Sequence, residues 1–403
     1  MSGASQDLLV PDLTSLSRIP ELNVINTCKY RIISNSSSIC TIVVQFDEDQ
    51  SPRGLPTHLI IRFEKSREGN PLLATAAIQR LAHQRLPHIV PKVWGAGHTQ
   101  TETGTQLTYM LSQFYMDTCT LDTVWDDLDT FTQYFMVKAV ASAMFQLRDV
   151  SLVEAGDEAQ KVLQGTPLER NATAPPTLVG GPACGYFPDF GSLLIAMVSP
   201  GSAKYSVDRN PDGAVTIRTQ SPEEANLGFS RTDLDLLTKT SGLCHNNLEP
   251  RNILVRQVKS DQGRATYQFV SVIGWADAAF LPLAFEIGSK DTCLGLQNQS
   301  WTWYRVYRAY AGTVLAKTFP GAHRICLKLI RAMVLTDLSR KDSNKLNVGN
   351  LVQKLWHERE KTGDHGAETG YVKSSDAERI GSFTAADNAV LELEALRSLG
   401  YIR

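Results

Sequence analysis

Apolar patterning divides the chain into a strand-rich first third and a mainly helical remainder. Residues 30–33 and 40–46 are β-rich runs on either side of a polar, serine-rich turn at 34–38, which predicts a hairpin. Residues 59–63 and 107–114 predict two further strands. The strand signal ends there, apart from short runs at 204–207 and 214–218 and the apolar run 253–255.

Helical periodicity appears once between these strands and then dominates. Residues 72–81 place apolar side chains on one side of a predicted helix, which Pro87 and Pro91 end. A long amphipathic helix is predicted up to residue 147, another runs from the cap Ser230 to residue 240, and helices follow from Trp301 onward. The last predicted helix covers residues 386–399 and stops at Gly400.

This order of elements predicts an α+β fold with two lobes, a small β-rich N-terminal lobe at 1–110 and a larger, mainly helical C-terminal lobe at 111–403. At 403 residues the chain is too long for one minimal domain. Residues 149–242 are the least regular stretch, and a long irregular stretch within a compact domain is usually functional. We therefore interpret it as an insertion on the substrate side.

The composition argues against several classes of function. A net charge of −2 argues against a nucleic-acid partner, and the longest apolar runs are too short for membrane insertion. Seven cysteines are scattered without CxxC pairing, so we expect buried free thiols, no metal site and a reducing compartment. The first residues lack the pattern of a secretory signal, so a cytoplasmic location is expected.

The most informative motif is residues 243–255, Leu-Cys-His-Asn-Asn-Leu-Glu-Pro-Arg-Asn-Ile-Leu-Val, followed by Val-Ile-Gly-Trp-Ala at 272–276. A kinase-type catalytic loop needs a histidine, an aspartate two residues later as proton acceptor, and an asparagine five further on for magnesium. His245, Leu248 and Asn252 have that spacing. A second aspartate on the following strand holds the metal as well.

This set of motifs resembles the aminoglycoside/choline phosphotransferase-like family, especially its fungal branch, with its His-Gly/Asn-Asp-Leu-x-Pro-x-Asn loop and Ile-Asp-Trp segment. Phe285-Glu286 is similar to the aromatic-Glu pair of that branch, and the strand 59–63 to the one with the phosphate-pairing cation, which places Arg62 in the lysine position. Residues 90–93 resemble the proline-containing turn, and 109–125 the hinge. The resemblance covers most of the chain and implies a protein-kinase-like fold.

The catalytic carboxylates of this family are missing here. Asn247 replaces the proton-accepting aspartate and Gly274 the metal-binding one. The first helix has no acid near Ala74 to orient the strand cation, and serine and asparagine replace the phosphate-cradling glycines. Loss of a general base typically costs a factor of ~10²–10⁴. Because phosphoryl transfer depends on positioned charge, we predict a degenerate site that uses no nucleotide, metal or other cofactor.

Several candidate residues have two readings. Asp277 could replace the missing metal ligand, although a carboxylate at the pocket edge is the favoured reading. His245 could be a base, although a structural backbone hydrogen bond is favoured. Arg62 could bind an anion or pair with a nearby acid, and Gly274 either opens space or reflects drift.

The candidate site therefore has two groups of residues. We expect the catalytic or donor groups to be Arg62, Asn247, Asn252 and Asp277. The pocket is expected to be formed by Tyr115, His245, Arg251, Gly274 and Trp275, where Arg251 could equally be a surface charge and Tyr115 or Trp275 a core residue.

Three functions are compatible with these losses. Fungal members of the family are often encoded with secondary-metabolite pathways, so the resemblance favours a repurposed, cofactor-free enzyme that binds and converts a small apolar intermediate, such as a cyclase or an intramolecular cycloaddition enzyme. The first alternative is a non-catalytic, pseudokinase-type binding protein, whose protein partner the sequence does not identify. The second is a residual ATP-dependent small-molecule kinase that uses Asp277 and Asn252 for magnesium.

Overall fold

The computed structural model describes residues 8–22, 29–47, 54–67, 70–152, 162, 178–220, 225–259, 265–292, 298–343, 347–360, 365–372 and 383–402. The chain forms two compact units. The first comprises Met1–Cys119, Val153–Thr173 and Leu254–Ala278, and the second Thr120–Leu152, Ala174–Ile253 and Ala279–Arg403. The predicted boundary at residue 110 and the substrate-side role of residues 149–242 stay predictions.

A five-stranded antiparallel sheet is the main element of the first unit. Its order is β1-β2-β3-β5-β4, with β1 (Lys29–Asn35), β2 (Ile39–Gln45), β3 (His58–Lys65), β4 (Val93–Gln100) and β5 (Gln106–Gln113). The predicted hairpin and the strands at 59–63 and 107–114 are confirmed. The strand β4 was not predicted, because Gly95 and Gly97 interrupt its apolar pattern.

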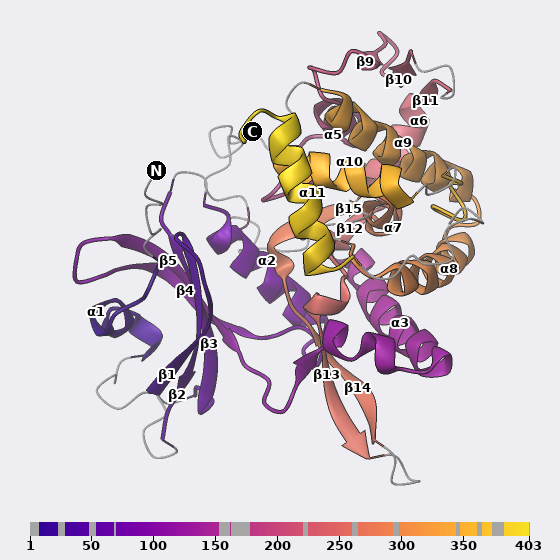
Figure 1. Cartoon of the computed structure of the whole chain (residues 1–403). Coiled ribbons are helices and arrows are strands. Elements are labelled where there is room, and N and C mark those ends of the chain that lie inside the picture. Colours follow the sequence, from indigo (N-terminus) through magenta and orange to yellow (C-terminus); the bar gives the residue numbers. More distant parts are fainter. Residues whose placement is uncertain are drawn as a thin grey trace. The chain divides into compact units, whose positions relative to one another are not determined.

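The two faces of this sheet follow from the alternation along its strands. On β3, Leu59, Ile61 and Phe63 belong to a buried core shared with the segment around α1 (Leu13–Ser17). Arg62 and Glu64 point to the opposite face. The helix α2 (Leu72–Arg85) contacts β4 and β5, and Figure 1 shows α1 and α2 on opposite sides of the sheet.

The first unit also contains β13 (Ile253–Lys259) and β14 (Ala265–Val272), which are neighbours in a small sheet. A short 3₁₀ turn, η9 (Trp275–Asp277), follows β14 and contacts α2. The strand β6 (Cys119–Thr120) lies where the chain passes from the first unit into the second.

Helices make up most of the second unit. They are α3 (Thr130–Phe145), α5 (Phe190–Met197), α6 (Arg231–Lys239), α7 (Leu283–Thr292), α8 (Trp301–Thr318), α9 (His323–Asp342), α10 (Val348–Glu360) and α11 (Ala385–Ser398). The predicted cap is confirmed, because the side chain of Ser230 accepts a hydrogen bond from the backbone N–H of Asp233. The predicted C-terminal helix is α11, which packs on α10 through Trp356, Phe383 and Leu391.

Short strands in this unit form two small sheets. The orders are β12-β15-β7-β8 and β11-β10-β9, with β7 (Val179–Gly181), β8 (Gly185–Phe187), β9 (Tyr205–Arg209), β10 (Val215–Thr219), β11 (Leu227–Phe229), β12 (Ser241–Cys244) and β15 (Ala279–Pro282). In the register of β12 and β15, Cys244 lies opposite Ala279, so His245 directly follows the end of a buried strand.

The predicted α+β class is confirmed: along the chain, an antiparallel sheet interrupted by one helix precedes a mainly helical unit. Cys40, Cys244 and Cys326 are buried free thiols as expected. The expectation of burial is wrong for Cys184, which is exposed, and Cys119 is only partly buried, while Cys28 and Cys293 lie outside the described residues. Within the described ranges, no helix is long and apolar enough to cross a membrane.

Candidate functional site

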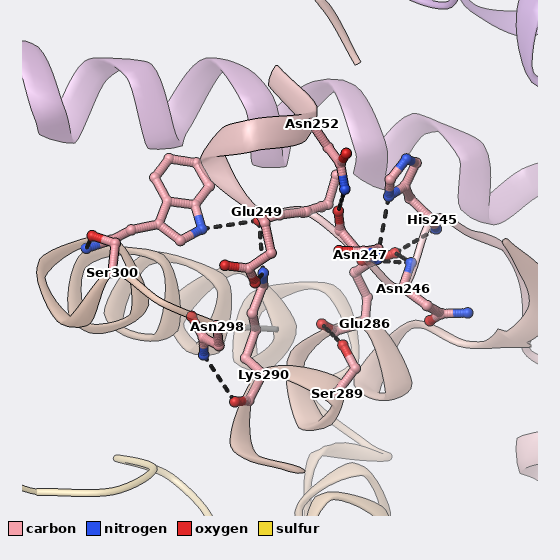
Figure 2. A network of polar contacts seen from close by, with 12 residues as sticks. His245, Asn246, Asn247, Glu249, Asn252, Glu286, Ser289, Lys290, Asn298 and Ser300 are labelled. Atoms are coloured by element: carbon pink, nitrogen blue, oxygen red, sulfur yellow. Dashed lines mark hydrogen bonds and ion pairs between the residues drawn. The ribbon is translucent and has the colours of Figure 1, made fainter. Parts of the chain in front are cut away.

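The backbone of the loop after β12 is held by one buried carboxylate. Glu286, on α7, is 1% exposed and accepts hydrogen bonds from the backbone N–H groups of His245, at 2.6 Å, and Asn246, at 2.9 and 3.0 Å (Figure 2). Burial raises the pKa of Glu286, while the N–H of Asn246 and the charge of Lys290 act in the opposite direction. Glu286 therefore fixes the backbone at the point where the strand ends.

The same loop is closed by contacts among its own polar residues. Asn246 has φ of 60°, a left-handed conformation that asparagine tolerates better than most residues. The backbone N–H of Asn247 donates to Nδ1 of the fully buried His245 at 3.2 Å. The side-chain amide of Asn252 donates to the carbonyl oxygen of Asn247 at 2.9 Å. The spacing seen in the sequence thus corresponds to a closed, hydrogen-bonded turn.

Leu248 and Glu249, further along the loop, are held by a second set of buried contacts. Nζ of Lys290, on α7, donates to the carbonyl oxygen of Leu248 at 2.7 Å and forms a buried ion pair with Glu249 (Figure 2). The indole N–H of Trp303, on α8, donates to the same carbonyl at 2.9 Å. Glu249 is only 4% exposed, so its carboxylate is engaged in holding the loop.

These contacts determine what the loop offers chemically. Asn247 carries an amide, which donates hydrogen bonds but takes up no proton at neutral pH. His245 accepts the N–H of Asn247 at Nδ1, which places the proton of a neutral ring on Nε2. The loop therefore provides hydrogen-bond donors at Asn247 and Asn252, and its one carboxylate, Glu249, is paired with Lys290.

Burial also governs the other titratable groups behind the loop. It raises the pKa of Cys244 and of Tyr307 well above their ordinary values, so both stay protonated. The hydroxyl of Tyr307 is buried with no hydrogen-bond partner among the described residues. Neither the buried thiol nor this phenol is a nucleophile at neutral pH.

In the first unit, Arg62 pairs with an acid of its own strand. Nε of Arg62 donates to Oε1 of Glu64 at 2.8 Å, and its Nη2 lies 2.7 Å from the same oxygen. The two residues are two positions apart on β3, so their side chains share one face of the sheet. Of the two interpretations of Arg62, the ion pair therefore has a specific partner. This partner is Glu64 on the same strand, and not an acid on α2.

The predicted pocket residues of the first unit gather near the end of β14. Gly274 has φ of 81° and ψ of 46° and precedes η9, which contains Trp275 and Asp277. Trp275 is 2% exposed and its indole N–H donates to the carbonyl of Val272 at 3.0 Å, which makes it a core residue. Tyr115 shares a hydrogen bond with Ser271, and burial raises its pKa.

The nine predicted site residues therefore form separate sets, and their roles stay predictions. His245, Asn247, Arg251 and Asn252 belong to one loop of the second unit, while Gly274, Trp275 and Asp277 belong to one turn of the first. Among the described residues, no cluster of three or more histidine, cysteine or acidic side chains could hold a metal ion.

Sequence reasoning missed the residues that hold the loop. The resemblance named Glu286 only as part of a motif, and it gave Lys290 and Trp303 no role. One partial signal was available: Glu286 directly follows the apolar residues 283–285, where a charged side chain is unusual. Such charges are expected to have buried partners.

Comparison with known proteins gives matches only among solved structures. No family model matches the chain, and no curated protein does. Similar structures include the GDP and kanamycin complex of APH(2″)-IIIa (TM-score 0.39, 14% identity, covering 96% of this chain and 98% of that one). The GDP complex of wild-type aminoglycoside 2′-phosphotransferase-IIIa has a TM-score of 0.36 and 12% identity, and the match covers 92% of this chain and 93% of that one. ADP-bound aminoglycoside phosphotransferase APH(2″)-Ib has a TM-score of 0.33 and 11% identity, and the match covers 78% of this chain and 94% of that one.

The structures to which this chain is similar are thus aminoglycoside phosphotransferases. Their identities of 11–14% and TM-scores of 0.33–0.39 indicate a distant likeness. The nucleotides and aminoglycosides in those complexes belong to those proteins and carry no inference for this one.

Proposed function

We propose that this chain is a phosphotransferase-like protein that transfers no phosphate and instead binds and converts a small apolar molecule without ATP. One observation carries the proposal. In a loop with kinase-type spacing, the proton-accepting position is Asn247, the loop's own carboxylate Glu249 is paired with Lys290, and one N–H of the Asn252 amide is bonded to the loop itself. A hydroxyl acceptor would find no base there.

The amide groups of this loop could catalyse a unimolecular reaction by donating hydrogen bonds to the substrate. Rigidly held amides stabilise charge that develops on a carbonyl oxygen, and enclosure of a flexible substrate favours its reactive conformer. An intramolecular cycloaddition needs only these contributions: two σ bonds form at the expense of two π bonds, and no atom, proton or electron is exchanged with a cofactor. Asn247 and Asn252 are the proposed donors in the loop, and Arg62 is a third candidate in the first unit.

A biosynthetic role in specialised metabolism is the finer form of this proposal, and it rests on the family resemblance of the motifs. The main alternative is a non-catalytic binding protein, which the exposed aromatic side chains of α3, described below, favour. The residual kinase is less well supported, because Asp277 and Asn252 would have to hold magnesium with one carboxylate between them.

Nucleotide binding is the most direct test. We expect millimolar ATP with magnesium to leave the melting temperature of the protein unchanged, because the charges that position a triphosphate are missing. A ligand at a hundred times its Kd would stabilise the fold by about 2.7 kcal/mol, which is a shift of several degrees. Differential scanning fluorimetry measures this, with an active aminoglycoside phosphotransferase as positive control.

Turnover separates the alternatives. Incubation with linear, unsaturated substrates that carry a carbonyl-activated alkene should give a cyclised product above the uncatalysed rate without ATP. The Asn247→Ala variant should lose most of that acceleration. A rate equal to background with every substrate would favour the binding protein, and γ-phosphate transfer to any acceptor would contradict the proposal.

A further inference from the structure

A large groove in the second unit is lined by residues remote in sequence from the loop. It has a volume of about 1240 Å³ and is bounded by α3, α8 and residues 368–372. The helices α3 and α8 pack side by side, as Figure 1 shows. No residue of the segment 243–255 lines it, so the groove is not part of the candidate site described above.

The groove is lined mainly by aromatic and aliphatic side chains. Tyr134 and Tyr310 meet edge to face, with ring centroids 6.0 Å apart, and Trp301 lies against Tyr304 at 5.3 Å. Val306, Val314 and Val372 add aliphatic surface. A large apolar recess with a few polar groups is typical of a site for an organic molecule.

Its floor is fixed by a buried polar network. Asp291 accepts hydrogen bonds from the hydroxyl of Tyr304, at 2.7 Å, and from Nε of Arg308, at 2.9 Å. His365 lies 2.7 Å from the other carboxylate oxygen. The backbone N–H of Tyr371 donates to the Tyr304 hydroxyl at 2.7 Å. The aromatic floor is therefore preorganised, which lowers the entropic cost of binding.

Charges at the groove favour an anion. Lys138, Arg305 and Lys317 line it and are exposed, and Glu368 is its one acidic residue. Within the described part of the chain, neither Arg305 nor Lys317 forms an ion pair. Three cations against one carboxylate give a net positive rim around an apolar interior.

An exposed aromatic cluster extends the groove. Phe131 is 72% exposed, Tyr134 45% and Phe135 46%, and the rings of Phe131 and Phe135 are 4.4 Å apart. Contiguous exposed apolar surface is a feature of interaction sites. Because Tyr134 belongs to both the cluster and the groove lining, the two form one continuous apolar surface.

We propose that this groove binds an organic anion with an aromatic or polycyclic body, such as a carboxylate or sulfonate on fused rings. The fused rings would lie on Tyr134 and Tyr310, which the buried Trp301 and Tyr304 adjoin, and the anionic group would face Arg305, Lys138 and Lys317. A small molecule fits better than a folded partner, because the surface is concave and combines an apolar lining with a few charged groups. The proposal does not depend on the reaction at the loop.

A pair of matched fluorescent probes tests it. We expect 8-anilinonaphthalene-1-sulfonate to bind saturably at one site per chain, with an affinity that falls as salt is added. The neutral N-phenyl-1-naphthylamine has the same rings without the sulfonate, and its affinity should not depend on salt. The triple variant Lys138→Gln, Arg305→Gln, Lys317→Gln should weaken the sulfonate about tenfold and leave the neutral probe within about twofold.

Two further variants keep the test sharp. Lys29→Gln, Lys65→Gln, Lys239→Gln removes three exposed charges that do not line the groove and should change neither affinity. Ala309→Trp, at an exposed position of α8, should block both probes by filling the groove. The proposal is overturned if the sulfonate binds without saturation, or with equal affinity to the wild type, the triple variant and the blocked variant.

Discussion

Replacing Glu286 by alanine is expected to lower the free energy of unfolding by about 3–5 kcal/mol, the largest effect of any substitution near the loop. The carboxylate is buried and accepts the backbone N–H groups of His245 and Asn246. Without it two buried donors lose their acceptor, and Lys290 loses a neighbouring negative charge. Chemical denaturation followed by tryptophan fluorescence measures the change.

Glu358→Ala is the matched control. Glu358 is also on a helix of the second unit, but its side chain is 60% exposed and its contact with Lys354 is 3.8 Å long. Removing it should change the free energy of unfolding by less than about 0.5 kcal/mol. Equal stability of the two variants would show that Glu286 does not hold the loop.

Gly242→Ala is expected to destabilise the fold by about 3 kcal/mol or more. A Cβ atom at Gly242, on β12, would lie 1.9 Å from the carbonyl oxygen of Arg148 and 2.7 Å from its Cα. These are main-chain atoms, and the hydrogen bond from Leu243 N–H to the Val150 carbonyl holds the two segments together. The contact therefore has no flexible side chain that could move aside.

Gly321→Ala tests whether the effect arises from this close approach. A Cβ at Gly321 would meet nothing within 4 Å, and the residue lies between α8 and α9. We expect its unfolding midpoint in denaturant to match that of the wild type. If Gly242→Ala were as stable as Gly321→Ala, β12 would not lie as close to the main chain of residue 148 as described here.

The sequence predicted those helices and strands that bury one face, because burial on one face gives a regular spacing of apolar residues. The first hairpin, the strand β3, the helix α2 and the capped helix α6 follow the predicted ranges closely, because their apolar spacing reports a single buried side. The strands β4, β7 and β8 were missed. Glycines such as Gly95, Gly180 and Gly185 lie within them and remove the apolar alternation that marks a strand.

For the candidate site, the sequence predicted the residues of the loop but not what holds them. The spacing of His245, Leu248 and Asn252 indicated a kinase-type loop, and the structure shows the hydrogen bonds that close this loop. Partners such as Glu286 and Trp303 come from helices about 40 and 55 positions away from the residues they contact. Contacts over such separations depend on helix packing, which no local pattern encodes.

Similarly, the acid beside Arg62 was sought on the following helix and lies two residues further along the same strand. The alternation of β3 already places residues 62 and 64 on one face, so this pair could have been predicted from periodicity alone. The family resemblance directed attention to α2 instead.

The backbone at position 274 restricts which residues evolution can place there. With φ of 81° and ψ of 46°, Gly274 occupies a region where a side chain with a Cβ costs about 1–2 kcal/mol, and asparagine and aspartate enter it more readily than the rest. Asparagine and aspartate are therefore the substitutions expected to disturb this turn least. Of these two residues, aspartate would add a carboxylate to the turn before η9 without requiring a new backbone conformation.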